Sequence, residues 1–157
     1  MIGSRSRAVT GAACGVAAVL VGTGCSGPAP VMSSQEVALV VGDRRSTPER
    51  VVTAYIAALQ EHDVDAARAL EADADAGLAD PWLDDAPRIS DVRVRPATPE
   101  PTAGSAAEGF RTAVYVPVQF TLHGGDGSMQ DGANGWGYPL ARNSDADPWR
   151  IVDDGVG

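Results

Sequence analysis

The chain has 157 residues, of which 44% are hydrophobic, 5% aromatic and 21% charged, and its 12 basic residues, all arginine, stand against 21 acidic ones. The formal charge of −9 excludes sequence-independent binding of nucleic acid, which needs a basic surface. The hydrophobic fraction excludes wholesale disorder, the length fits one domain, and two cysteines are too few for a disulfide-rich scaffold.

The first 24 residues have the pattern of an export signal. Arg5 and Arg7 precede an uncharged, weakly hydrophobic run of 17 residues from Ala8 to Gly24. A basic start, a short apolar stretch and small residues at its end are typical of a secretory signal. A membrane-spanning helix needs about 20 strongly apolar residues, so the run fits a spanning helix less well. We therefore predict that residues 1–24 are a signal peptide that is removed on export.

The end of this signal resembles a bacterial lipobox, in which signal peptidase II cuts before a cysteine that follows two small residues. Thr23 and Gly24 are the small residues, and Cys25 is the cysteine. Gly22 departs from the pattern, which prefers leucine, valine or alanine there, and cutting at the rival Cys14 would leave almost no apolar stretch upstream. The resemblance implies a diacylglyceryl group on Cys25, and two acyl chains anchor a protein stably in the lipid bilayer. The alternative is an ordinary signal peptide with an incidental cysteine.

Removal of residues 1–24 changes the charge and the cysteine count of the mature chain. Ten arginines would remain against 21 acids, a formal charge of −11, and Cys25 would be the only cysteine. No intrachain disulfide is then possible. Residues 25–46 form the predicted lipidated N-terminus and tether, because glycine, serine and proline dominate its start. Within it, the apolar run 37–41 fits an edge strand, an arm folded onto the domain, or an unpaired linker.

Helices are predicted at the start of the domain, which spans residues 47–157. Ser46 and Glu49 have the spacing of a capping box around a proline that suits a first helical turn. The apolar residues that follow have helical spacing as far as Leu59. Asp63 is a good N-cap for a second helix, and an irregular acidic segment containing Trp82 comes after it.

The second half of the domain has the pattern of an antiparallel sheet. Strands are predicted over 89–95, 112–122, 136–142 and 149–152, with a surface loop over 96–107. In the best of them, valines, a phenylalanine and a leucine alternate with Tyr115, Gln119 and other residues of the opposite face. Pro117 and Pro139 cannot donate to a ladder, so each is predicted to mark an edge or a bulge. Helices followed by a meander predict an α+β fold with about four strands.

This element order resembles the nuclear transport factor 2-like superfamily. The resemblance rests on Thr47-Pro-Glu-Arg-Val-Val-Thr-Ala-Tyr-Ile-Ala-Ala-Leu near the start, and on Trp136-Gly-Tyr-Pro-Leu-Ala-Arg and Trp149-Arg-Ile-Val-Asp at the end. Secreted actinobacterial lipoproteins of this type often carry such a pattern. It implies a cone, in which a curved antiparallel sheet wraps around a long helix and often encloses a pocket.

The sequence offers no catalytic constellation for such a pocket. Enzymes of the superfamily place acids, tyrosines or histidines inside the cone, where an apolar environment shifts their pKa values. The core face of the predicted strand 112–122 carries neither acid nor histidine, and no position matches a catalytic motif of the family. Tyr55, Trp82 and Trp136 are predicted either to pack in the core or to line the mouth of the cone, where a small apolar ligand could bind.

Metal and cofactor sites are not predicted either. His62 and His123 lack partners at the spacing of a zinc site, and no cofactor motif is present. Asp73 and Asp75 resemble part of a calcium loop, but the closing glutamate is missing. We therefore expect an extracytoplasmic, membrane-anchored lipoprotein whose domain binds a small ligand or an envelope protein without catalysis. The alternative is a small-molecule isomerase, dehydratase or hydrolase, and the sequence leaves the oligomeric state open.

Overall fold

The computed structural model describes residues 32–84, 87–125 and 129–155, so the predicted signal, Cys25 and the first part of the tether lie outside the described residues. Four helices come first: α1 (Ser34–Val41), α2 (Pro48–Gln60), α3 (Val64–Arg68) and α4 (Asp80–Asp84). Five strands follow: β1 (Arg88–Val94), β2 (Thr98–Glu100), β3 (Thr112–His123), β4 (Gly132–Arg142) and β5 (Arg150–Ile151). This order confirms the predicted α+β class.

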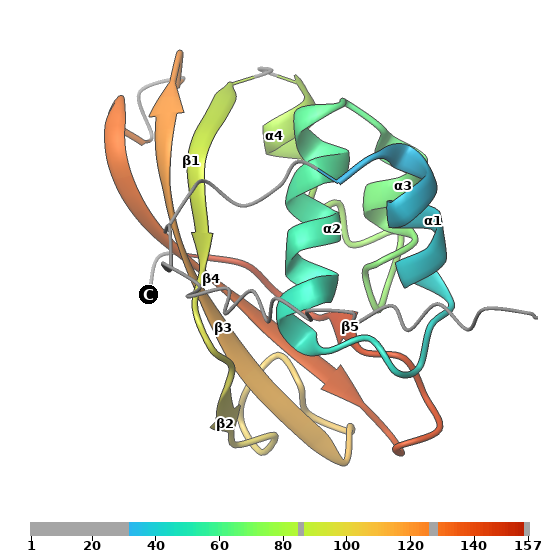
Figure 1. The fold of residues 1–157 in the computed structure, drawn as a ribbon. Coiled ribbons are helices and arrows are strands. Elements are labelled where there is room, and N and C mark those ends of the chain that lie inside the picture. The colour runs from blue at the N-terminus through green and yellow to red at the C-terminus, as the bar shows by residue number, and fades with distance from the viewer. Residues whose placement is uncertain (1–31, 85–86, 126–128, 156–157) are drawn as a thin grey trace, which may run out of the picture.

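The strands form one curled antiparallel sheet, and α2 lies against its concave face (Figure 1). The strand order is β1-β3-β4-β5, and β2 pairs with β3 on the same edge as β1. The longest ladder joins β3 to β4, from Thr112 opposite Arg142 to Leu122 opposite Gly132. The four predicted strands form the path β1-β3-β4-β5, and residues 98–100 of the predicted loop 96–107 add the short β2, which pairs with a part of β3 that β1 does not reach.

Helix α2 begins where the sequence predicts, but with a different cap. Thr47 is the N-cap residue, and its side chain accepts a hydrogen bond from the backbone amide of Arg50 at 3.3 Å. The predicted capping box of Ser46 and Glu49 is not formed. Ser46 is buried and donates to Asp43, while the Glu49 carboxylate accepts from the backbone amide of Ala97 at 2.8 Å. Glu49 thus joins α2 to the segment that leads into β2.

Residues 34–41 form a helix, so the apolar run 37–41 is neither an edge strand nor an unpaired linker. The capping box of the chain lies here, between Ser33 and Glu36, and it starts α1. Val37 and Val40 are 2% and 1% exposed and belong to the hydrophobic core that α2 also builds. The hydrophobic core therefore reaches into the predicted tether, where Met32 also packs against it.

Pro117 and Pro139 lie inside strands that remain in regular register. The carbonyl of Pro117 accepts from Arg95, just beyond β1, and that of Pro139 accepts from Val152, just beyond β5. A strand residue directs its carbonyl and its amide position to the same side, so neither proline removes a donor from the β3–β4 ladder. Neither proline therefore marks an edge strand or a bulge, and the missing amides point to the two places where a neighbouring strand ends.

The irregularity of the sheet lies in β1 instead of at the prolines. The register between β1 and β3 shifts between Ser90 and Arg93, and Asp91 has a φ of 53°. This conformation is uncommon outside glycine, although asparagine and aspartate tolerate it best. Asp91 thereby turns out toward solvent at the bulge.

The two faces of the sheet differ in character. Side chains of the inner face, such as Val116, Val118 and Phe120, are buried in the core that α2 shares. On the outer face, Tyr115 is half-buried and Gln119 is exposed, as the alternation predicts. A small second core covers one end of the outer face with Ala107, Ala113 and Ala141. The other end of that face is bare of such a cover among the residues that the structure describes.

Candidate functional site

The interior contains a pair of tyrosines from the two main layers of the fold. Tyr55 comes from the buried face of α2 and Tyr138 from the inner face of β4, and they are 0% and 1% exposed. Their rings meet edge to face, with centroids 5.6 Å apart and planes at 70°. Burial raises the pKa of both phenols, so both stay protonated at neutral pH.

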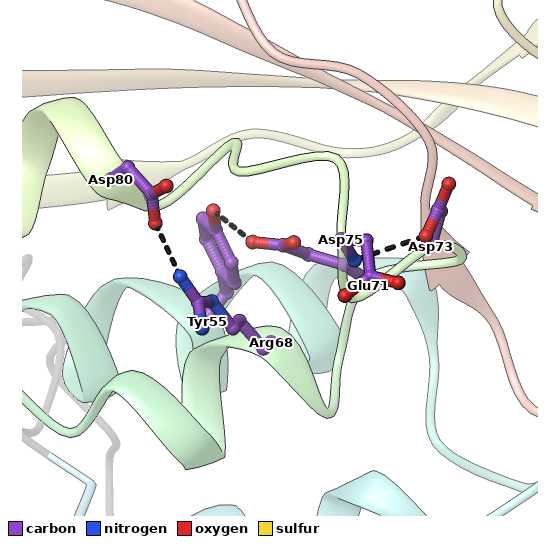
Figure 2. Close-up of polar contacts among 6 residues, drawn as sticks. All are labelled: Tyr55, Arg68, Glu71, Asp73, Asp75 and Asp80. Carbon is purple, nitrogen blue, oxygen red and sulfur yellow. Dashed lines mark hydrogen bonds and ion pairs between the residues drawn. The ribbon is translucent and has the colours of Figure 1, made fainter.

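Tyr55 donates its hydroxyl proton to a buried carboxylate. The distance from Tyr55 Oη to Glu71 Oε1 is 2.9 Å, and Figure 2 shows the two side chains pointing at each other. Glu71 is 4% exposed, and Oε2 has no hydrogen-bond partner among the residues that the structure describes. Burial raises the pKa of the Glu71 carboxyl, while the Tyr55 hydroxyl and the nearby amide of Ala79 oppose that rise.

Backbone pairing places Glu71 in the interior. The residues on either side of it bond to Ile151 of β5: the Ile151 amide donates to Leu70 at 3.0 Å, and the Ala72 amide donates to Ile151 at 2.7 Å. This parallel bridge holds the segment against the edge of the sheet. With its backbone held there, the Glu71 side chain bonds to Tyr55 of α2.

The other charged groups near Glu71 lie further out. Arg68 pairs with Asp80 at 2.9 Å, and both side chains are more than 40% exposed (Figure 2). The Asp73 carboxylate accepts from the backbone amide of Asp75 at 3.0 Å, as in an ordinary turn. Within residues 32–84, 87–125 and 129–155, no three histidine, cysteine or acidic side chains are grouped so that they could hold a metal ion.

A second carboxylate lies between two indoles. Asp154 Oδ2 accepts from Nε1 of Trp82 at 3.3 Å and from Nε1 of Trp136 at 3.2 Å. The two indoles are perpendicular, with centroids 5.5 Å apart. Burial raises the pKa of Asp154, the two indole donors oppose that rise, and the Asp154 charge adds to the raised pKa of Tyr138. The group orders the aromatic side chains where the sheet meets α4.

The predicted pocket residues therefore fall into two neighbouring groups. Trp82, 7% exposed, and the half-buried Trp136 meet at Asp154, whereas the fully buried Tyr55 pairs with Glu71. The sequence reasoning missed both carboxylates. One signal could have indicated them, because a core rich in tyrosine and tryptophan needs buried acceptors for its phenol and indole donors.

The two histidines lie at the surface. His62 is exposed, with a φ of 55°, in the turn after α2, and it does not belong to that helix. His123 ends β3, and its Nε2 lies 3.2 Å from the hydroxyl oxygen of Ser90. Neither histidine approaches the buried carboxylates described above, which lie on the inner side of the sheet.

An open groove of about 590 Å³ lies against the bare end of the sheet. Cross-strand pairing puts Gln119 opposite Gly135 and Thr121 opposite Ala133, and all four belong to the outer face. The small residues of β4 leave room beside the longer side chains of β3. The full lining comprises Asp91, Arg93, Gln119, Phe120, Thr121, Ala133, Asn134 and Gly135. The groove is thus separated from Glu71 and Asp154 by the sheet.

Comparison with known protein families, curated proteins and solved structures gave no match. Among the helices of the described residues, none is both long and apolar enough to cross a membrane. The arrangement of side chains is then the basis for a functional proposal.

Proposed function

We propose that this chain is a lipid-anchored extracytoplasmic protein. The support for the anchor is the sequence Arg5, Arg7, an uncharged stretch and Cys25 after two small residues. The first packed helix begins nine positions after Cys25. A fully extended segment of that length spans about 30 Å, so the anchor would hold the domain close to the bilayer surface.

The domain is proposed to bind a partner without catalysing a reaction. The single observation that supports this best is the position of the groove relative to the buried carboxylates. Glu71 and Asp154 accept hydrogen bonds inside the fold, whereas the groove lies on the outer face of the sheet. A ligand in the groove would not reach either carboxylate. Its exposed lining suits recognition of a polar partner.

A cone of the nuclear transport factor 2-like type remains our interpretation of the fold. The support is a long helix held by a curled sheet and an interior rich in aromatic residues. In that interpretation Trp82 and Trp136 line the mouth of the cone, whereas the fully buried Tyr55 packs in the core. Trp136 is only half-buried, which leaves part of its ring for contact with a ligand.

An isomerase, dehydratase or hydrolase is the second candidate, because of one feature of Glu71. A buried carboxyl with a raised pKa and an oxygen without a partner is a common form of general acid. A substrate would need to reach a side chain that is 4% exposed and already bonded to Tyr55. We therefore prefer the binding function.

The anchor is tested by metabolic labelling with a tagged palmitate in the host. The wild type and Cys14→Ala are expected to incorporate label and to be recovered with membranes. Cys25→Ala is expected to incorporate none, because the thiol that carries the lipid is gone. Equal labelling of Cys25→Ala and wild type would contradict an anchor at Cys25. Loss of label in Cys14→Ala alone would place the lipid on Cys14 instead.

A further inference from the structure

Three arginines line the outer face of the sheet along β1 and its continuation. Arg88 lies opposite His123 and Arg93 opposite Gln119, and both partners belong to the outer face of β3. Arg95 donates to the side-chain oxygen of Gln119 at 2.9 Å, so it lies on the same face. All three arginines are exposed. We call Arg88, Arg93 and Arg95 the arginine row.

This row is unusual in a chain with 12 arginines and 21 acids. The long strands β1, β3 and β4 together contain one acidic residue, Asp91 in the bulge. The ion pairs formed among the described residues involve Arg68 and Arg142, not the row. Arginines therefore outnumber acidic residues along these strands, on a protein whose formal charge is −9.

The row borders the groove, and the groove supplies further hydrogen-bonding groups. Arg93 itself lines it, and Arg95 bonds the oxygen of Gln119, which leaves the amide nitrogen of Gln119 as a donor to a ligand. The Asp91 carboxylate also lines the groove, where it is an exposed hydrogen-bond acceptor. Thr121 adds a hydroxyl group. The groove thus offers donors and an acceptor, and the three arginines of the row outnumber the one carboxylate that lines it.

We propose that the groove and the arginine row bind an acidic peptide segment of a partner protein. The guanidinium group of arginine pairs with carboxylates in a bidentate geometry. A peptide backbone presents both carbonyls and amides, which match the donor of Gln119 and the acceptor of Asp91. A phosphate polymer would offer acceptors alone. This inference rests on the proposed binding function and names the chemical class of the partner.

The test measures the fluorescence anisotropy of a labelled peptide of alternating glutamate and serine, titrated with the purified full chain. The same peptide with glutamine in place of glutamate is the control ligand. We expect the glutamate peptide to bind and the glutamine peptide not to bind. The affinity should fall as salt increases, because exposed charges are screened. Equal binding of the two peptides would overturn the proposal.

Variants locate the binding surface. Arg93→Gln should weaken binding about threefold to fivefold, the range of an exposed ion pair, whereas the exposed Arg111→Gln outside the groove should not. Gly135→Val should weaken binding about tenfold by filling the groove, since one or two methylene groups suffice in a pocket. A Cβ at Gly135 meets nothing within 4 Å, so the fold should tolerate it, and Thr98→Val on exposed β2 is the matched control.

Other results would reject the inference. Unchanged binding by Gly135→Val would show that the groove is not the site. Equal losses in Arg93→Gln and Arg111→Gln would show charge attraction without a site. Stronger competition by polyphosphate or by anionic phosphatidylglycerol vesicles than by unlabelled peptide would assign the surface to a different ligand. The anchor is measured separately, by whether the chain is recovered in the membrane fraction or in the soluble fraction. Failure of the anchor and failure of the groove are therefore distinguishable.

Discussion

Removal of the Tyr55 hydroxyl tests the buried pair most directly. Tyr55→Phe keeps the ring, and with it the edge contact to Tyr138, but leaves the Glu71 carboxylate without the donor at 2.9 Å. The second oxygen of Glu71 has no partner among the described residues, so the variant would bury a carboxylate that no side chain satisfies. Leaving a buried charged group unsatisfied costs about 2–3 kcal/mol.

This cost should be visible in thermal unfolding. For a domain of this size, 1 kcal/mol corresponds to about 4 °C in Tm, so we expect Tyr55→Phe to lower Tm by about 8–12 °C at pH 7. The assay is circular dichroism of the mature chain, residues 25–157, with Cys25→Ser to avoid the lipid. The loss should shrink at lower pH, because a protonated Glu71 no longer buries a charge.

Tyr115→Phe is the matched control. Its ring is half-buried on the outer face, so loss of the hydroxyl should change the free energy of unfolding by less than about 0.5 kcal/mol. If Tyr55→Phe unfolds at the same temperature as this control, the buried hydrogen bond contributes nothing to stability. A loss that does not depend on pH would also contradict the role of the Glu71 charge.

Three further predictions concern the rest of the fold. The pKa of Glu71 is raised in the folded state, so the native protein binds the carboxyl proton more tightly than the unfolded chain does. The free energy of unfolding should therefore fall as the pH rises from about 4.5 through the folded pKa. Urea unfolding across that range should show that Glu71→Gln lacks this pH-dependent part of the stability. Gly137→Ala should lower the free energy of unfolding by about 1–3 kcal/mol, because the new Cβ would collide with the Tyr115 ring. In a Tyr115→Ala background the same change should lower it by nothing, which a double-mutant cycle measures. Val40→Ala should destabilise the fold by about 2 kcal/mol in urea unfolding, because Val40 is buried. Leu39→Ala is the control, and since Leu39 is 70% exposed it should change stability by less than about 0.5 kcal/mol. Equal effects of the two changes would mean that α1 does not pack as described.

The main elements of the fold could be predicted because their patterns are local. The spacing of apolar residues from Val51 to Leu59 defines α2, and strict alternation over 112–122 defines β3. Helix α1 was missed because its run of valines favours a strand by composition. The segment forms a helix instead, because the capping box at Ser33 and Glu36 starts one and Val37 is buried against α2.

The candidate sites could be predicted only in part, because they depend on contacts between distant residues. The Tyr55–Glu71 bond crosses 16 positions, and the Trp82–Asp154 bond crosses 72. Neither separation leaves a periodic signal in the sequence. The groove likewise depends on the register that puts Gly135 beside Gln119, which is fixed by the pairing of β3 with β4.

The place of Glu71 between β5 and α2 also has a consequence for how the protein opens. Its flanking backbone is bonded to Ile151 of β5, and its side chain is bonded to Tyr55 of α2. The segment cannot detach from the sheet without withdrawing Glu71 from the helix. The last strand, this segment and the helix should therefore open as one cooperative unit, and the amide hydrogens of Ala72 and Ile151 should exchange with solvent at a common rate instead of fraying separately.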